Sequence, residues 1–83
     1  MNTATLTFSY RSEERARSVA AAVEREAGDI EGGRTTATVT REGETVAVTV
    51  DARDLSALRA GANTWGTLVE VAERAAELGA QRN

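Results

Sequence analysis

The sequence predicts an α+β fold of order βαββα, in which a three-stranded antiparallel sheet carries two helices packed on one face. Three observations support it. Apolar and polar residues alternate over residues 4–10, two segments have apolar residues at helical spacing, and Glu42-Gly43 separates two further alternating segments. A period of two marks a strand with one buried face, and a period near 3.6 marks an amphipathic helix. Helices packed on one face of an antiparallel sheet form an α+β arrangement.

The first half of the chain is expected to form a strand and a helix. The strand covers residues 4–10, with the side chains of Leu6, Phe8 and Tyr10 on one face. Ser12 follows as a helix N-cap, because its hydroxyl can accept a hydrogen bond from a first-turn N–H. Gly28 is expected to end this helix. The apolar stripe of the helix consists of Ala16, Val19, Ala20, Val23 and Ala27.

The second half is expected to form a hairpin and a long helix. A loop over residues 28–34, anchored by Ile30, leads into two strands joined at Glu42-Gly43. Asp51 or Asp54 then caps a helix that runs to about Leu78, with Gly79 as its stop. The inward-facing residues of the two strands are Ala37, Val39, Val46, Val48 and Val50.

Composition limits the possible chemistry. The chain has 83 residues, which predicts one domain over 1–83 with an ordered core at about 4–78. Cysteine and histidine are absent, which excludes disulfides, thiolate chemistry, Cys/His zinc sites and imidazole catalysis. The longest apolar run, residues 19–23, is too short for a membrane span or a secretory signal, so we expect a soluble, cytoplasmic protein with no membrane partner.

The charged residues are also informative. The net charge is −3, so attraction to phosphate backbones should be weak unless arginines cluster. All ten basic residues are arginine. The use of arginine alone favours a source organism with a high-GC genome that is adapted to salt, as some archaea are. Codon bias alone is the alternative explanation.

The second helix has more apolar surface than one sheet can cover. Its first stripe should pack on the sheet and consists of Leu55, Leu58, Ala62, Trp65, Val69, Ala72 and Ala76. A second stripe, Leu68, Val71, Ala75 and Leu78, begins halfway along. It either meets Val19 and Val23 of the first helix or forms a surface for another chain.

Two further surfaces are candidates for contact with a partner. One helix face, formed by Arg59, Asn63 and Gly66, would let another backbone approach closely and accept hydrogen bonds from this chain. The alternative is that Arg59 simply faces solvent and the amide makes a local hydrogen bond. The outer face of the sheet should be rich in threonine and solvated, and it lacks the aromatic residues that stack on bases. The open strand edges offer a route to a homodimer.

We find no candidate catalytic, metal-binding or cofactor-binding residues in the sequence. The acidic pairs Glu13/Glu14 and Asp51/Asp54 stand at helix starts, where capping explains them. Gly32-Gly33 lacks the lysine and helix start of a phosphate-binding loop. No GXXG connects two helices, so a KH-type RNA clamp is not supported. The sequence therefore indicates a protein that is not an enzyme.

The stretch from Asp54 to Ala75, DLSALRAGANTWGTLVEVAERA, resembles the C-terminal helix of the Pcc subunit of the KEOPS complex. The shared pattern is an acidic residue, Leu-Arg, a small residue, Asn and an apolar block. In this chain the pattern falls on Asp54, Leu58, Arg59, Gly61, Asn63, Leu68, Val69 and Val71. The front half is similar too, with ATLTFSY, an Ala-rich helix and a hairpin ending in VTVDARD. The resemblance spans roughly residues 4–78.

The resemblance implies a function. KEOPS makes N6-threonylcarbamoyladenosine next to the anticodon of tRNA, and its catalytic subunit is a threonylcarbamoyltransferase of ATPase-like fold. The Pcc-type subunit is a non-catalytic dimerisation module that binds this subunit and supports tRNA binding indirectly, through the complex. The expected partner and dimer residues are Arg59, Asn63, Gly66, Leu68, Val71, Ala75 and Leu78. A divergent Pcc-like paralogue, a stand-alone KH-like RNA-binding module and a small acid–base enzyme are the alternatives.

Overall fold

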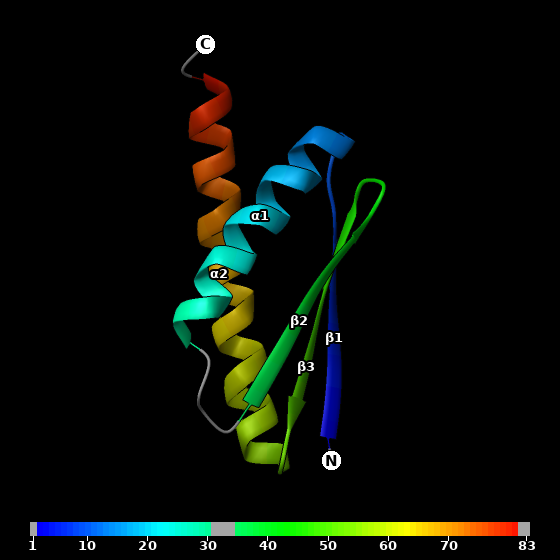
Figure 1. Ribbon diagram of the computed structural model, residues 1–83, viewed down its shortest axis with the longest axis vertical. Helices are drawn as coiled ribbons and strands as arrows, with labels where there is room; N and C mark the ends of the chain where they lie inside the picture. The colour runs from blue at the N-terminus through cyan, green and yellow to red at the C-terminus, as the bar shows by residue number, and fades with distance from the viewer. Residues whose placement is uncertain (1, 31–34, 82–83) are drawn as a thin grey trace.

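The computed structural model describes residues 2–30 and 35–81 and confirms the predicted fold class. Its three strands form one antiparallel sheet of order β1-β3-β2. Both helices lie on the same side of this sheet (Figure 1). The elements are β1 (Asn2–Ser9), α1 (Glu13–Ile30), β2 (Thr35–Glu42), β3 (Thr45–Ala52) and α2 (Leu55–Gln81).

The hairpin partner β3 occupies the centre of the sheet. It pairs with β1 on one side and with β2 on the other, so that Val48 stands between Leu6 and Val39. Strands β1 and β2 are therefore both edges. The turn between β2 and β3 consists of Gly43 and Glu44, and Gly43 has φ of 62°. A glycine adopts this left-handed conformation without steric cost, which suits a two-residue hairpin turn.

The core lies between the sheet and the two helices. The inward residues of β3, Val46, Val48 and Val50, have no exposed surface. The main core cluster consists of Val19, Val23, Val48, Val50, Trp65, Val69 and Ala72. On the opposite face of the sheet the threonines of β1 and β2 are exposed, as the alternation predicted.

Helix α1 begins as expected but extends further. The backbone N–H of Arg15 donates a hydrogen bond of 3.0 Å to Ser12 Oγ, which makes Ser12 the N-cap. The prediction that Gly28 ends the helix is wrong, since α1 continues to Ile30. A glycine within a helix costs only about 1 kcal/mol relative to alanine, so it does not by itself end one. Residues 31–34 of the predicted loop, and the side chain of Ile30, lie outside the described part of the chain.

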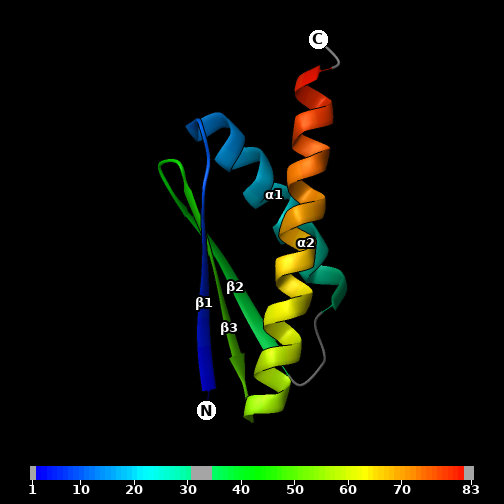
Figure 2. The ribbon, with the colours of Figure 1, turned by 180° about the vertical axis from the view of Figure 1, so that it is seen from behind.

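Helix α2 is capped by Asp54. The N–H of Ala57 donates a hydrogen bond of 2.7 Å to Asp54 Oδ1. Asp51, the other candidate cap, belongs to β3, and its carboxylate accepts a hydrogen bond of 2.6 Å from the Thr3 hydroxyl. Gly79 does not stop the helix, which reaches Gln81. Figure 2 shows the C-terminal end of α2 extending beyond the hairpin end of the sheet.

The face that α2 turns to the sheet is shifted from the predicted stripe. Leu55 was expected to cover the sheet, but 54% of its surface is exposed. The buried row runs instead through Ala57, Gly61, Trp65 and Val69, at steps of four residues. A Cβ on Gly61 would stand 3.1 Å from side-chain carbons of both Thr35 and Val50. Small residues at 57 and 61 let the helix approach the sheet closely there, and this turns Leu55 outward.

Candidate partner interface

The second apolar stripe of α2 is largely exposed. Val71 and Leu78 have 54% and 61% of their surfaces accessible. Ala75 is exposed as well, and Leu68 is partly buried against the main core. The alternative in which Val71 and Leu78 meet Val19 and Val23 is therefore wrong. Those two α1 valines belong instead to the main core cluster, together with Val69 and Ala72 of α2.

A groove runs beside this stripe, between α1 and the C-terminal half of α2. Its volume is about 650 Å³. Alanines line it from both helices: Ala21, Ala22, Ala72, Ala75 and Ala76. Charged and hydroxyl side chains of α1, Glu14, Arg15, Ser18 and Arg25, also line it. Because Ala75 belongs to both features, the groove and the exposed stripe form one continuous surface, which we call the helix surface.

A second hollow, of about 690 Å³, opens between α1 and α2 on the side of β1. At its base the Tyr10 hydroxyl donates a hydrogen bond of 2.7 Å to Glu73 Oε2. Burial raises the pKa of the Tyr10 phenol, and the hydrogen bond and negative charge of Glu73 raise it further, because all three disfavour tyrosinate. Ser9, Arg11, Ser12, Arg15 and Glu77 complete the lining.

The three residues predicted to grip another backbone lie nearer the start of α2 than Val71 and Leu78. Successive helical residues are rotated by about 100°, so Arg59 and Gly66 point about 100–140° away from Val71 and Leu78. Asn63 is only about 60–80° away from them in rotation, but it lies eight residues, about 12 Å along the axis, before Val71. Arg59 and Asn63 are exposed, and a Cβ on Gly66 would meet nothing within 4 Å. The structure thus separates Arg59, Asn63 and Gly66 from Val71 and Leu78, by rotation about the helix for Arg59 and Gly66 and by distance along it for Asn63. Ala75, near Val71 and Leu78, lines the groove described above.

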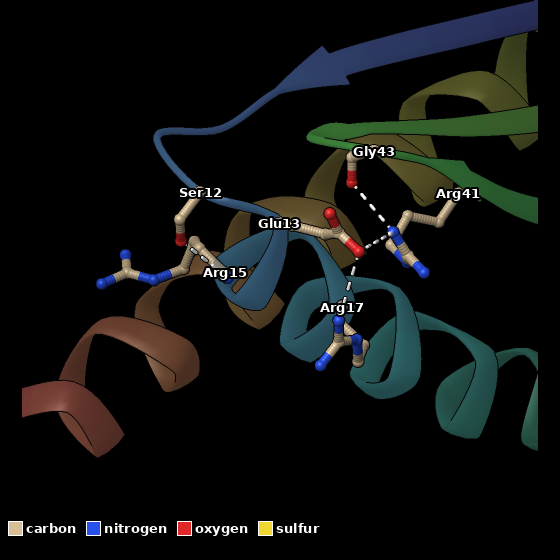
Figure 3. Close-up of polar contacts among 6 residues, drawn as sticks. All are labelled: Ser12, Glu13, Arg15, Arg17, Arg41 and Gly43. Atoms are coloured by element: carbon tan, nitrogen blue, oxygen red, sulfur yellow. Dashed lines mark hydrogen bonds and ion pairs between the residues drawn. The ribbon is translucent and has the colours of Figure 1, made fainter.

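Glu13, at the start of α1, pairs with two arginines. The Glu13 carboxylate lies 3.3 Å from Arg17, one turn along the helix, and 3.6 Å from Arg41 of β2 (Figure 3). Arg41 also donates a hydrogen bond of 2.9 Å to the carbonyl of Gly43. These exposed pairs link the helix start to the hairpin turn, and such surface pairs contribute little to stability.

The described residues contain no grouping typical of catalysis. The side chains of residues 2–25 and 35–78 are described, and no set of three or more acidic ones among them is placed to hold a metal ion. None of the charged or polar side chains in these two ranges is buried. No helix of the described chain is long and apolar enough to cross a membrane.

Sequence reasoning missed two features of this region. The Tyr10–Glu73 hydrogen bond joins residues 63 positions apart, and only the fold brings them together. A tyrosine ending an apolar alternation was the available signal, since a partly buried phenol usually finds a hydrogen-bond partner. The alanine lining of the groove carries no distinctive sequence signal, because alanine is common on every face of a helix.

Together, the fold and this surface define a small βαββα domain with two helices on one face and an exposed apolar surface on the longer helix. The family model described as transcription factor Pcc1 matches residues 3–77. The chain therefore belongs to the Pcc1 family, as its resemblance to the Pcc subunit predicted. No curated protein matches the chain. The description of the family names no catalytic activity.

Proposed function

We propose that this protein is a non-catalytic scaffold subunit of the KEOPS complex, which acts in the cytoplasm as a homodimer and binds the catalytic subunit. The observation that carries the proposal is the exposure of Val71 and Leu78 on the C-terminal half of α2, beside a groove lined by alanines. Membership of the Pcc1 family supports it. Small residues allow a neighbouring helix to approach closely, and exposed valine and leucine supply apolar area for it to bury.

In this proposal the two functions use different surfaces. The helix surface binds helices of the catalytic subunit, and the open edges of β1 and β2 are available for pairing with a second copy. Contact with tRNA is made through the assembled complex, because a net charge of −3 gives weak attraction to phosphate.

A stand-alone RNA-binding module is less well supported. RNA-binding sheets stack bases on exposed aromatic residues. Phe8 and Tyr10 instead face the helices and are partly buried, and Trp65 is only 4% exposed. The outer face of the sheet presents threonine hydroxyls, which offer no stacking platform.

The test is a light-scattering measurement of mass, on the protein alone and mixed with the KEOPS catalytic subunit. We expect roughly twice 8.8 kDa for the protein alone and a larger stable species in the mixture. Val71→Asp with Leu78→Asp should abolish the larger species while the fold, followed by circular dichroism, is retained. Leu68 is left unchanged because it contacts the core.

A matched double variant, Arg59→Ala with Asn63→Ala, tests the other face of α2. Both residues are exposed, so this variant should also fold. Normal binding by this variant, together with loss of binding by the aspartate variant, would assign the partner to the helix surface. A monomer that ignores the catalytic subunit would contradict the proposed function.

A further inference from the structure

The C-terminal part of α2 projects beyond the sheet that supports the rest of the helix. The helix has 27 residues and each strand has eight. At about 1.5 Å per helical residue and about 3.3 Å per strand residue, α2 is roughly 40 Å long and the sheet roughly 27 Å. About two turns therefore extend past the end of the sheet. Figure 2 shows the C-terminal end of α2 beyond the sheet. This projecting part includes Ala75 and Leu78 of the helix surface.

Tyr10 lies where the sheet ends and the projection begins. Its backbone N–H donates a hydrogen bond of 2.9 Å to the carbonyl of Glu44 in the hairpin turn. Its ring packs against both core clusters, the main one and a smaller one formed by Ala16, Ala20 and Val46. Its hydroxyl reaches Glu73 at 2.7 Å. A single residue thus connects the hairpin turn, through its backbone, with the core and α2, through its side chain.

No second polar side-chain contact in the described structure links α2 to another element. Among the side chains of residues 2–25 and 35–78, the Tyr10–Glu73 bond is the one hydrogen bond that joins α2 to another element. Arg15 and Glu77 also line this hollow, yet they form no ion pair with each other. A phenylalanine at position 10 could fill the same apolar space. The hydroxyl therefore has a role that packing alone does not explain.

We infer that the Tyr10–Glu73 hydrogen bond is a positioning contact that sets the distance between the projecting part of α2 and the N-terminal half of α1. Both hollows between the helices take their width from this distance. The bond is partly buried and has a charged acceptor, and such bonds are stronger than neutral ones. The consequence for partner binding rests on the proposed function, since a groove held at one width is preorganised for an incoming helix.

The distance between the helices can be measured directly. The chain has no cysteine, so Glu14→Cys and Arg74→Cys would place two spin labels on exposed sites of α1 and α2. We expect pulsed electron paramagnetic resonance to give a narrow distance distribution in the otherwise unchanged protein. Adding Tyr10→Phe or Glu73→Ala should broaden and lengthen it, whereas Glu73→Gln, which keeps an acceptor, should change it less. Glu77→Gln removes a carboxylate one turn away without removing the bond, and should change nothing.

Partner binding supplies the second readout. Tyr10→Phe should weaken association with the catalytic subunit about tenfold, the loss expected for one hydrogen bond to a charged group. Unchanged distance distributions in both Tyr10→Phe and Glu73→Ala would overturn the inference, whatever the partner does. Failure of the unaltered protein to bind the catalytic subunit would instead contradict the proposed function, and the distances would still decide the role of Tyr10.

Discussion

At the residue scale, the two glycines in the middle of α2 have opposite surroundings. Gly61 is buried, and a Cβ there would stand 3.1 Å from carbons of Thr35 and Val50. Gly66 has open space around it. Family resemblance pointed to Gly61 as a small residue, but only the packing explains it. The close approach of α2 to the sheet depends on the absence of a side chain at this position.

Replacing these glycines should therefore have opposite effects. Gly66→Ala should raise the free energy of unfolding by about 0.5–1 kcal/mol, because alanine loses less entropy than glycine in a helix. Gly61→Leu should lower it by about 1–3 kcal/mol through overpacking. Urea unfolding followed by the fluorescence of Trp65, the single tryptophan, measures both. If Gly66 also admits another backbone, Gly66→Ala should weaken self-association or partner binding while stabilising the fold.

The cap of α2 gives a second prediction at this scale. Asp54→Ala should lower the free energy of unfolding by about 1 kcal/mol, because the N–H of Ala57 loses its acceptor. Asparagine is an equally good N-cap residue, so Asp54→Asn should cost much less. Denaturant titrations of the two variants make the comparison. Equal losses in both would show that the charge of Asp54, and not its capping bond, stabilises the protein.

At the element scale, α2 has one face in the core and one outside it. Val69 is fully buried and Val71, two residues on, is 54% exposed. Val69→Ala should cost about 2 kcal/mol, from lost burial and the cavity that remains. Val71→Ala should change stability by less than about 0.5 kcal/mol. Thermal or urea unfolding of this pair tests the orientation of the helix, and a large loss from Val71→Ala would contradict it.

The sequence was sufficient to predict the elements but not their ends. Alternation identified all three strands, and helical spacing identified both helices, because burial of one face imposes a period on apolar residues. The helices end beyond Gly28 and Gly79, since glycine only permits a stop and neighbouring hydrogen bonds can carry the helix through it. Leu55 was misplaced because Ala57 and Gly61, the small residues that set the contact, carry almost no hydrophobic signal.

The candidate interface was predicted only in part, again because the sequence pattern does not show how the elements pack. The spacing of Val71 and Leu78 showed that α2 had a second apolar stripe, but it could not show whether α1 covered it. That depends on where the helices cross, which the sequence pattern does not encode. Grouping Arg59, Asn63 and Gly66 with the stripe joined residues that the helix separates, either in rotation or along its length, so which of these surfaces binds a partner stays a prediction.

At the scale of the whole molecule, stability should depend on alkaline pH through one side chain. The chain has no lysine, histidine or cysteine and a single tyrosine, so Tyr10 is the side chain that titrates between pH 9 and the range of arginine. Folding raises its pKa, chiefly by burial. The folded state therefore favours the neutral phenol. Its contribution is fully present below the unfolded pKa of about 10 and is lost as pH rises toward the folded value.

The expected result is a free energy of unfolding that declines above about pH 10, by up to about 1.4 kcal/mol per pH unit. Tyr10→Phe should start lower near neutral pH, because it lacks the bond to Glu73, and then stay flat. Urea titrations at a series of pH values compare the two proteins. An equal alkaline decline in both would exclude Tyr10 as its source.

The projection of α2 also makes the helix a lever. Its base is fixed by the Asp54 cap and the close approach at Gly61, and its far end stands about 30 Å beyond Gly61. A tilt of about 10° about Gly61 would move that end by about 5 Å, about one helical turn. Small changes in packing at the sheet are thus amplified into larger displacements of the C-terminal end of α2. If such a subunit joins two partner proteins, the distance between them would depend on how α2 packs in its core.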